Sequence, residues 1–338
     1  MDNGLSPVNS PSDGRGAHGG MNSGASSSPS PCPVPKKTLI VIAGPTASGK
    51  TAYSIQLAKA LHTVILSADS RQFYREMRIG TAAPTEKEVG QVRHYFVHHI
   101  GIEDPYDVAD YERDAMQLLG ELFKTHDAVV MTGGSGLFID AVCHGIDAMP
   151  DITPETRVKV QKLYDEGGLQ ALQEQVQRLD PAYYALVDRQ NPRRLQRALE
   201  VCFQTGQPFS SFRSGTAVQR DFDILKYALL WDREALVSRI DRRVDMMMEQ
   251  GLLEEARALY PMRRLNALNT VGYKELFAYF DHQSTLDEAV GQIKVHTRQY
   301  AKRQMTWLRK DARYQWIMPE DLGNTLSALR QAFASLRP

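Results

Sequence analysis

The chain has 338 residues, and its 40 lysines and arginines are balanced by 40 acidic residues, so the formal net charge is zero. This balance excludes a protein that binds polyanions through a uniformly basic surface, and it excludes a strongly acidic disordered chain. Any contact with nucleic acid must therefore be local. A chain of this length with 42% hydrophobic residues is large enough to bury an enzyme-sized core.

Cysteine content and hydropathy restrict the class of protein further. The three cysteines, Cys32, Cys143 and Cys202, are far apart and form no CxxC or Cys/His cluster, so neither a disulfide framework nor a zinc module is expected. No apolar run approaches the roughly 18 residues that a membrane helix needs. The chain also does not open with a secretory signal. We therefore expect a cytoplasmic protein without membrane contact.

The first 37 residues are predicted to be a disordered tail, because 20 of the first 35 are Ser, Pro or Gly. A transit peptide is an alternative interpretation of this segment. It is disfavoured because Arg15 is the only arginine there and because Asp2 and Asp13 are acidic.

Residues 38–150 show the pattern of an α/β protein. Short apolar runs at 38–43, 64–68 and 128–131 predict buried strands, and the spacing of apolar residues at 51–61 predicts a helix. Strands that alternate with helices indicate a parallel sheet flanked by helices. Ligands of such sheets bind at the carboxyl ends of the strands.

The second half of the chain is mainly helical. Residues 151–187 have a polar helical pattern with breaks at Gly167-Gly168 and Asp180-Pro181, which predicts a small all-helical insertion. The core is expected to resume over 188–316 and to end in a helical extension at 317–338. Within it we predict a basic helix at 192–204, a strand at 227–231 and long amphipathic helices at 233–260 and 286–310.

A phosphate-binding motif lies between the first strand and the first helix. The motif matches GxxxxGK[ST] at every fixed position, in the segment Gly44-Pro45-Thr46-Ala47-Ser48-Gly49-Lys50-Thr51. The glycines let backbone N–H groups converge on an anion, Lys50 adds a positive charge, and the Thr51 hydroxyl can bind Mg²⁺. The sequence therefore predicts a site for a phosphorylated ligand with Mg²⁺ as cofactor.

Asp69 follows the second predicted strand and has three possible roles. It could hold Mg²⁺ through water, as in kinases and hydrolases that use ATP or GTP. It could act as a general base, because a carboxylate at the end of a strand projects into the same crevice as the phosphates. It could also cap a helical turn.

Several further motifs resemble those of the tRNA dimethylallyltransferase (isopentenyltransferase) family. They occur in the family's order and cover about residues 38–316. The bacterial type is indicated, because no cysteine follows Cys202 and a C-terminal zinc finger is therefore absent. The motifs are the phosphate loop, Asp69-Ser70-Arg71-Gln72, Met77-Arg78-Ile79-Gly80-Thr81-Ala82-Ala83-Pro84, Gly133-Gly134-Ser135-Gly136-Leu137-Phe138, Asn191-Pro192-Arg193-Arg194-Leu195, Val271-Gly272-Tyr273-Lys274-Glu275 and Thr297-Arg298-Gln299-Tyr300-Ala301-Lys302-Arg303-Gln304.

This resemblance implies transfer of a dimethylallyl group from dimethylallyl diphosphate to N6 of the adenosine 3′ of the anticodon, in tRNAs that read codons beginning with U. The phosphate loop then holds the diphosphate of the donor. Asp69 matches the residue that accepts the proton of the attacking nitrogen. Ser135 matches a position, often Thr in the family, that contacts the adenosine or the diphosphate. Either Arg239 or Arg243 matches the arginine that contacts the diphosphate; the alternative for both is a solvated pair bridged to Asp241, Asp245 or Glu249.

The resemblance also implies that the chain grips a tRNA anticodon stem-loop, in part through the insertion, and we expect a monomer. Residues 291–316 carry seven basic residues and one acidic residue with aromatic residues between them, a pattern suited to phosphate contacts and base stacking. On composition alone, a solvated charged face explains the same run. The residues expected to bind tRNA are Asp69, Ser70, Arg71, Gln72, Ser135, Arg157, Gln190, Asn191, Pro192, Arg193, Arg194, Arg298, Lys302 and Arg303.

Three alternative functions stay open at this point. An enzyme that prenylates free adenine nucleotides fits the phosphate loop, but it needs neither the insertion nor the basic C-terminal helix. A kinase that uses ATP or GTP leaves the later motifs unexplained. An RNA-binding module without activity leaves the intact phosphate loop and Asp69 without a purpose.

Overall fold

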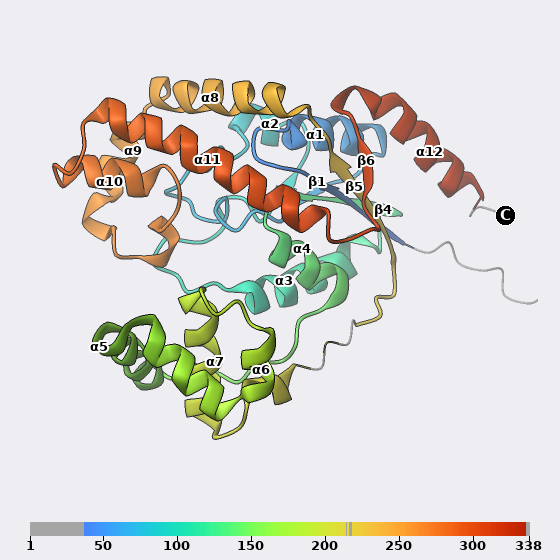
Figure 1. The fold of residues 1–338 in the computed structure, drawn as a ribbon. Helices are drawn as coiled ribbons and strands as arrows, with labels where there is room; N and C mark the ends of the chain where they lie inside the picture. The colour runs from blue at the N-terminus through green and yellow to red at the C-terminus, as the bar shows by residue number, and fades with distance from the viewer. Residues whose placement is uncertain (1–36, 214, 216–217, 336–338) are drawn as a thin grey trace, which may run out of the picture. The chain divides into compact units, whose positions relative to one another are not determined.

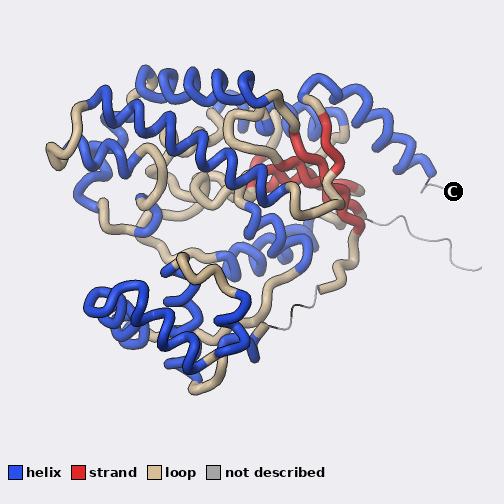
Figure 2. Tube along the Cα trace, viewed as in Figure 1, coloured by secondary structure: helices blue, strands red, loops and turns tan. Residues whose placement is uncertain are grey.

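The computed structural model describes residues 37–213, 215 and 218–335. All but the last residue of the predicted disordered tail lies outside the described residues. One six-stranded sheet has the strand order β3-β2-β4-β1-β5-β6, and every pairing in it is parallel. Figure 2 shows these strands gathered together with helices around them. The strands are β1 (Thr38–Ala43), β2 (Ile65–Ser67), β3 (His94–Tyr95), β4 (Ala128–Gly133), β5 (Asp223–Leu229) and β6 (Gln315–Ile317).

Helices cover both faces of the sheet, and β1 shows why its sequence is apolar throughout. Leu39 and Val41 join a buried cluster with residues of α3 and α4, whereas Ile40 and Ile42 join a second cluster with residues of α1 and α12. A strand that is buried on both faces has no reason to alternate with polar residues. The helices are α1 (Lys50–Ala60), α3 (Val108–Leu122), α4 (Gly136–His144) and α12 (Leu322–Ser335), and the short α2 (Glu86–Val89) precedes β3 (Figure 1). The predicted α/β fold with a helix-flanked parallel sheet is confirmed.

A third cluster forms around four C-terminal helices and the loop at 74–79. One long helix was expected over 233–260, and this prediction is wrong, because α8 ends at Glu249 and α9 begins at Leu252. Gly251 between them has φ +100°, a left-handed conformation that interrupts a helix. The four helices are α8 (Arg233–Glu249), α9 (Leu252–Leu259), α10 (Tyr273–Phe280) and α11 (Leu286–Leu308).

The segment predicted as a helical insertion contains α5 (Pro154–Leu179) and α6 (Pro181–Leu186). Gly168 has non-helical φ and ψ of 62° and −157°, which places a kink inside α5 at the expected glycine pair. The apolar cluster of these helices continues beyond residue 187 into α7 (Pro192–Thr205) and ends at Phe209. No helix of the described residues is long and apolar enough to cross a membrane.

Candidate active site

The phosphate loop connects β1 to α1 and has the backbone conformation of an anion cradle. Ala47 and Gly49 have φ of 63° and 86°. Left-handed residues in such a loop turn successive N–H groups toward a common side, where an anion can accept from them. Gly44 is needed for space, because a Cβ there would lie 2.8 Å from Ser48 Oγ.

Three side chains from distant parts of the chain hold this loop. Trp231 Nε1 donates to the carbonyl oxygen of Ser48 at 2.8 Å. Arg239 Nε donates to the carbonyl oxygen of Ala47 at 2.9 Å, and its guanidinium lies over the Trp231 ring. Gln304 Oε1 accepts from the Thr46 N–H at 2.8 Å. The loop is therefore ordered by the protein itself, so little has to be rearranged when an anion binds.

Lys50 and Thr51 begin α1 and line the same cavity as the loop. Lys50 Nζ donates to the Pro45 carbonyl oxygen at 2.8 Å. Burial lowers the pKa of the Lys50 ammonium to about 8; the Asp69 carboxylate opposes this shift, and Arg243 adds to it. The Thr51 hydroxyl has no recorded hydrogen bond within the described part of the chain and is available to a ligand.

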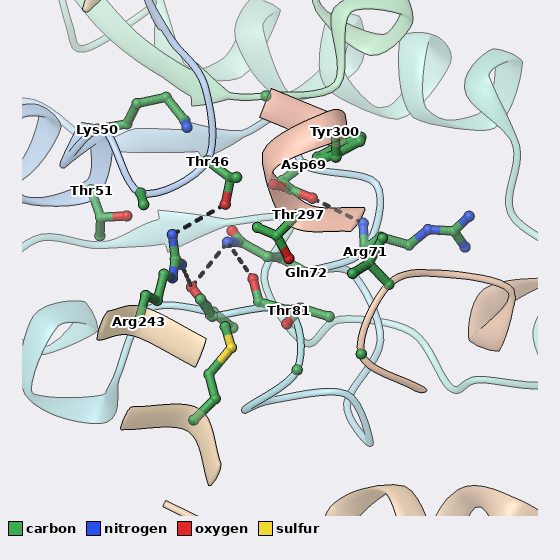
Figure 3. A pocket seen from close by; sticks show the side chains of 18 of the residues that line it. Thr46, Lys50, Thr51, Asp69, Arg71, Gln72, Thr81, Arg243, Thr297 and Tyr300 are labelled. Atoms are coloured by element: carbon green, nitrogen blue, oxygen red, sulfur yellow. Dashed lines mark hydrogen bonds between the residues drawn. The ribbon is translucent and has the colours of Figure 1, made fainter. Parts of the chain in front are cut away.

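Arg243 is the arginine of the predicted pair that reaches over the loop. Its Nη1 lies 3.4 Å from Thr46 Oγ1, a contact that Figure 3 marks. Its Nη2 lies 3.4 Å from the carbonyl oxygen of Ala82. Burial lowers its pKa, and the carboxylate of Asp69 opposes that shift. Thus Arg243 points its guanidinium at the cavity, whereas Arg239 braces the loop.

The alternative of a solvated arginine pair is not supported. Among the described residues, Asp241 pairs with Arg298 and Asp245 pairs with Lys294, and no ion pair joins Arg239 or Arg243 to Asp241, Asp245 or Glu249.

Asp69 and Ser135 come together because β2 and β4 end side by side. The Ala68 N–H donates to the Thr132 carbonyl oxygen at 2.7 Å, and a Cβ on Gly133 would lie 2.3 Å from the Ala68 carbonyl oxygen. This close approach brings the segments after the two strands into contact. Ser135 Oγ accepts from the Ser70 N–H at 3.1 Å, so Asp69, which precedes Ser70, lies beside it.

The Asp69 carboxylate is partly free to react. One oxygen accepts from the Arg71 N–H at 3.2 Å, and the Asp69 carbonyl oxygen accepts from the Gln72 N–H at 3.0 Å, so Asp69 caps the turn that follows it, although no helix begins there. The other oxygen has no recorded partner among the described residues. Figure 3 shows Asp69 between Thr46 and Tyr300 in the cavity. Burial, together with the nearby Asp69 carboxylate, raises the pKa of Tyr300 to about 12, so the tyrosine stays a neutral hydroxyl.

One cavity of about 1800 Å³ contains all of these groups. Its walls are the phosphate loop, the segment after β2, the loop at 78–90, the segment after β4, and faces of α8 and α11. Figure 3 shows Lys50, Thr46 and Arg243 on one side and Asp69, Arg71 and Tyr300 on the other. The predicted anion-binding and proton-accepting groups therefore face a common space.

Other predicted site residues are engaged inside the protein. Gln72 Oε1 accepts from Ser67 Oγ at 3.1 Å, and its Nε2 donates to the Ala82 carbonyl oxygen at 3.2 Å. Arg71 Nη1 donates to the Ala267 carbonyl oxygen at 3.0 Å. Arg298 forms a two-point ion pair with Asp241, with both N–O distances 2.9 Å. These three side chains brace the walls of the site.

The remaining residues expected to bind tRNA lie on the surface. Arg303 is exposed and contributes to the cavity wall, whereas Arg157, Gln190 and Lys302 are exposed outside it. Asn191 caps α7 by accepting from the Arg194 N–H at 3.3 Å, and Pro192 begins that helix. Arg193 and Arg194 are exposed in its first turn, with no ion pair recorded within the described chain.

Sequence reasoning assigned no role to Trp231 or Gln304, although both hold the phosphate loop. For Gln304 a signal was present. It shares the buried face of α11 with Ile293, Ala301 and Leu308. A polar residue on an apolar helix face needs a hydrogen-bond partner in the core. Trp231 follows a strand, and no pattern distinguishes it from any other aromatic residue.

A strand, phosphate loop and helix at the carboxyl edge of a parallel sheet define a P-loop α/β protein that binds a phosphorylated ligand. Comparison with known proteins narrows this class, because residues 72–311 match the family described as IPP transferase. The chain belongs to the IPP transferase family.

Relatives of known name agree with this family. The chain is 50% identical over 279 residues to a tRNA dimethylallyltransferase of Christiangramia forsetii, covering 82% of this chain and 92% of the relative. It is 48% identical over 293 residues to tRNA dimethylallyltransferase 1 of Bacteroides thetaiotaomicron, covering 87% of this chain and 95% of the relative.

Solved structures share the fold. The crystal structure of a full-length tRNA isopentenylpyrophosphate transferase from Bacillus halodurans matches with a TM-score of 0.66 at 32% identity, over 89% of this chain and 98% of that one. A eukaryotic dimethylallyltransferase acting on tRNA matches with a TM-score of 0.73 at 25% identity, over 89% of this chain and 80% of that one.

Proposed function

We propose that this chain transfers the dimethylallyl group of dimethylallyl diphosphate to N6 of the adenosine 3′ of the anticodon, in tRNAs that read codons beginning with U. The products are N6-isopentenyladenosine in the RNA and free diphosphate. The observation that carries the proposal is one cavity in which an anion cradle faces a carboxylate. The phosphate loop and Lys50 lie on one side of this cavity, and Asp69 lies on the other. Ser135 is bonded to Ser70, the residue that follows Asp69.

The cradle side serves the leaving group. When the bond between the allylic carbon and the diphosphate oxygen breaks, its electron pair stays on the oxygen and the diphosphate gains negative charge. The N–H groups of the phosphate loop, the Lys50 ammonium and the Arg243 guanidinium are placed to stabilise that charge. We assign the diphosphate contact to Arg243, because Arg239 is already bonded to the loop's own carbonyl.

The carboxylate side serves the acceptor. The exocyclic N6 of adenine is a poor nucleophile, because its lone pair is delocalised into the ring. As N6 forms its bond to the allylic carbon, one N6 proton has to leave, and Asp69 accepts it through the oxygen that has no hydrogen bond to another described residue. Ser135 is held beside Asp69 by Ser70, where it can orient the adenine or the diphosphate.

The residues around the cradle fit a magnesium ion. Mg²⁺ prefers oxygen ligands and keeps several waters, so a single protein hydroxyl with phosphate oxygens is a usual environment for it. The Thr51 hydroxyl supplies such a ligand at the start of α1. When bound, Mg²⁺ adds positive charge that stabilises the departing diphosphate.

The tRNA surface is proposed to combine three regions: the rim of the cavity on α11, the segments after β2 and β4, and the helical insertion of residues 151–187 with the start of α7. Gln72 and Arg298 are expected to support this surface rather than to touch RNA, because their polar groups are bonded within the protein. The proposed RNA contacts are Asp69, Ser70, Arg71, Ser135, Arg157, Gln190, Asn191, Pro192, Arg193, Arg194, Lys302 and Arg303. Because one chain supplies all of these groups, we propose that it acts as a monomer.

One assay tests the proposal against its alternatives. Purified protein with Mg²⁺ and labelled dimethylallyl diphosphate is offered an unmodified anticodon stem-loop, AMP, or no acceptor, and a parallel reaction contains ATP alone. We expect label in the RNA only. Label in AMP but not in RNA would indicate the free-nucleotide enzyme, and ATP turnover without prenyl transfer would indicate a kinase. Replacing the target adenosine with guanosine is the matched control and should abolish transfer.

A further inference from the structure

Gln304 connects the basic helix α11 to both loops of the candidate site. The side chain is 7% exposed, although α11 carries exposed lysine and arginine on its other faces. Its Oε1 accepts from the Thr46 N–H of the phosphate loop at 2.8 Å. Its Nε2 donates to the Gly134 carbonyl oxygen, in the segment after β4, at 2.9 Å. The carboxamide thus satisfies one backbone group in each loop.

The segment after β4 is shaped to receive side chains of α11. A Cβ on Gly134 would lie 2.2 Å from Gln304 Nε2, and a Cβ on Gly136 would lie 2.3 Å from the Trp307 ring. Neither glycine has a positive φ, so each is needed for space and not for its backbone conformation. One turn before Gln304, Tyr300 lines the same cavity as Ser135. This face of α11 therefore fits closely against the catalytic segment.

On the phosphate-loop side, Gln304 holds the peptide unit that also binds Lys50. The N–H of the Pro45–Thr46 peptide donates to Gln304, and its carbonyl accepts from Lys50 Nζ at 2.8 Å. Thr46 also carries the Oγ1 that Arg243 approaches. If this peptide turned, both cationic groups of the cradle would lose their positions. Gln304 itself is directed at backbone groups and not at the centre of the cradle.

We infer that Gln304 is a positioning residue for the diphosphate donor. By fixing the Pro45–Thr46 peptide against Gly134, it sets the orientation of Lys50 and Arg243 before the donor binds. The inference rests on the proposed function, since it assigns Gln304 a role in donor binding for that reaction. It predicts that removing the carboxamide weakens donor binding while leaving RNA binding unchanged.

The first test measures the affinity of the full-length protein for dimethylallyl diphosphate with Mg²⁺ by calorimetry, without RNA. In Gln304→Leu the Thr46 N–H and the Gly134 carbonyl lose their partner, and we expect the dissociation constant to rise by about tenfold or more. The dissociation constant for an anticodon stem-loop should change less than about twofold. Gln292→Leu, an exposed glutamine on the same helix, is the matched control and should leave donor affinity unchanged.

The second test uses the close contact at Gly134. Gly134→Ala in the wild-type background should displace the carboxamide and weaken donor binding about as much as Gln304→Leu does. In a Gln304→Ala background the added methyl group has room, so Gly134→Ala should cause little further loss. Independent, additive losses from the two substitutions would overturn the inference.

The outcomes separate this inference from the proposed function. If wild-type protein transfers the prenyl group and folded Gln304→Leu protein binds the donor normally, the positioning role is wrong while the function stands. A lowered melting temperature with unchanged donor affinity would indicate a purely structural role and would also overturn it. If Gln304→Leu does not fold, Gln304→Glu replaces it. That variant keeps an acceptor for Thr46 but loses the donor to Gly134, and normal donor affinity in it would overturn the inference. Absence of prenyl transfer by wild-type protein refutes the proposed function instead.

Discussion

At the residue scale, the site separates groups that react from groups that hold them. Lys50, Arg243 and Asp69 point polar atoms at the cavity, whereas Trp231, Arg239 and Gln304 bond to backbone groups of the phosphate loop. The two kinds of residue should respond differently to substitution. Removing a reacting group changes the rate or the charge of the site, and removing a holding group changes the geometry on which the reacting groups depend.

Asp69→Ala should lower the single-turnover rate of prenyl transfer by roughly 10²- to 10⁴-fold, because it removes the carboxylate proposed to take the N6 proton. The dissociation constant for the anticodon stem-loop should stay nearly unchanged. Rapid-quench kinetics with saturating substrates measures the rate, and a filter-binding titration measures the affinity. Asp221→Ala, at an exposed position outside the cavity, is the control. Weakened RNA binding at an unchanged single-turnover rate would contradict the assignment of Asp69 as base.

Lys50 should make donor binding depend on pH. Its pKa is lowered by burial to about 8, so the free protein carries the ammonium below that pH and loses it above. A diphosphate needs the charged form. The affinity for dimethylallyl diphosphate should therefore be level with respect to Lys50 below pH 8, and above it should fall by up to about tenfold per pH unit.

Calorimetric titrations from pH 6.5 to 9.5 at constant Mg²⁺ test this expectation. Lys50→Met should bind dimethylallyl diphosphate weakly at every pH, and its affinity should not start to fall near pH 8. Lys59→Met, on the exposed side of the same helix, should keep the fall in donor affinity above pH 8. If the affinity of Lys50→Met for the donor fell above pH 8 as steeply as that of the wild type, the pH dependence would belong to another group.

At the element scale, α9 holds a wall of the cavity through one side chain. Glu255 Oε2 accepts from the backbone N–H groups of Arg78 and Ile79 at 3.0 and 2.8 Å, and its Oε1 accepts from the Gly80 N–H and the Tyr273 hydroxyl at 2.9 and 2.7 Å. A Cβ on Gly80 would lie 2.7 Å from the Tyr273 ring. Two motifs that the sequence showed separately, around Gly80 and around Tyr273, thus meet at a residue outside both.

Glu255→Gln should destabilise the protein by about 1–3 kcal/mol, because an amide NH₂ cannot accept the bonds that one carboxylate oxygen accepts and leaves N–H groups unpaired. Urea unfolding at neutral pH measures the change in the free energy of unfolding. Glu254→Gln, an exposed neighbour on the same helix, should have an effect within about 0.5 kcal/mol. Equal effects of the two substitutions would mean that the Glu255 hydrogen bonds contribute nothing to stability.

Some of these elements can be predicted from sequence patterns, and others cannot. The β1 strand and the phosphate loop were predictable, because a strand buried on both faces is a continuous apolar run and the loop has fixed glycine spacing. The β3 and β6 strands have two and three residues, too few to show periodicity. The break between α8 and α9 depends on the left-handed conformation of Gly251, and a lone glycine in a helical pattern does not reveal its φ.

The site residues follow the same division. Motif residues such as Lys50 and Asp69 were predictable, because their chemistry requires particular residue types at the carboxyl edge of the sheet. The ion pair of Arg298 with Asp241 was not, because it depends on how α11 packs against α8. Ion pairs between elements that are distant in sequence decide which basic residues stay free for a partner. These ion pairs cannot be predicted from composition.

At the scale of the whole molecule, the zero net charge and the proposed RNA substrate are compatible because charge is distributed unevenly. Residues 291–316 carry a net charge of +6, with seven basic residues and one acidic residue, and acidic residues elsewhere balance them. Part of this charge is used internally, since Lys294 and Arg298 pair with aspartates of α8. The positive charge that remains available to an RNA backbone is concentrated in the exposed residues of α11 and the turn after it, among them Lys302 and Arg303.

This distribution makes the salt dependence of RNA binding a direct measure of which cations touch phosphate. If Lys302 contacts a phosphate of the anticodon stem-loop, Lys302→Ala should weaken binding and reduce the slope of log affinity against log salt by about 0.7–0.9, the contribution of one released counterion. Arg298→Ala should leave the slope nearly unchanged, because its guanidinium is neutralised by Asp241. Lys124→Ala removes an exposed lysine in the turn after α3 that pairs with Glu121, and it controls for the loss of net charge. Because each substitution removes one positive charge, a general electrostatic effect would lower all three slopes equally, and only a local contact lowers the slope for Lys302 alone.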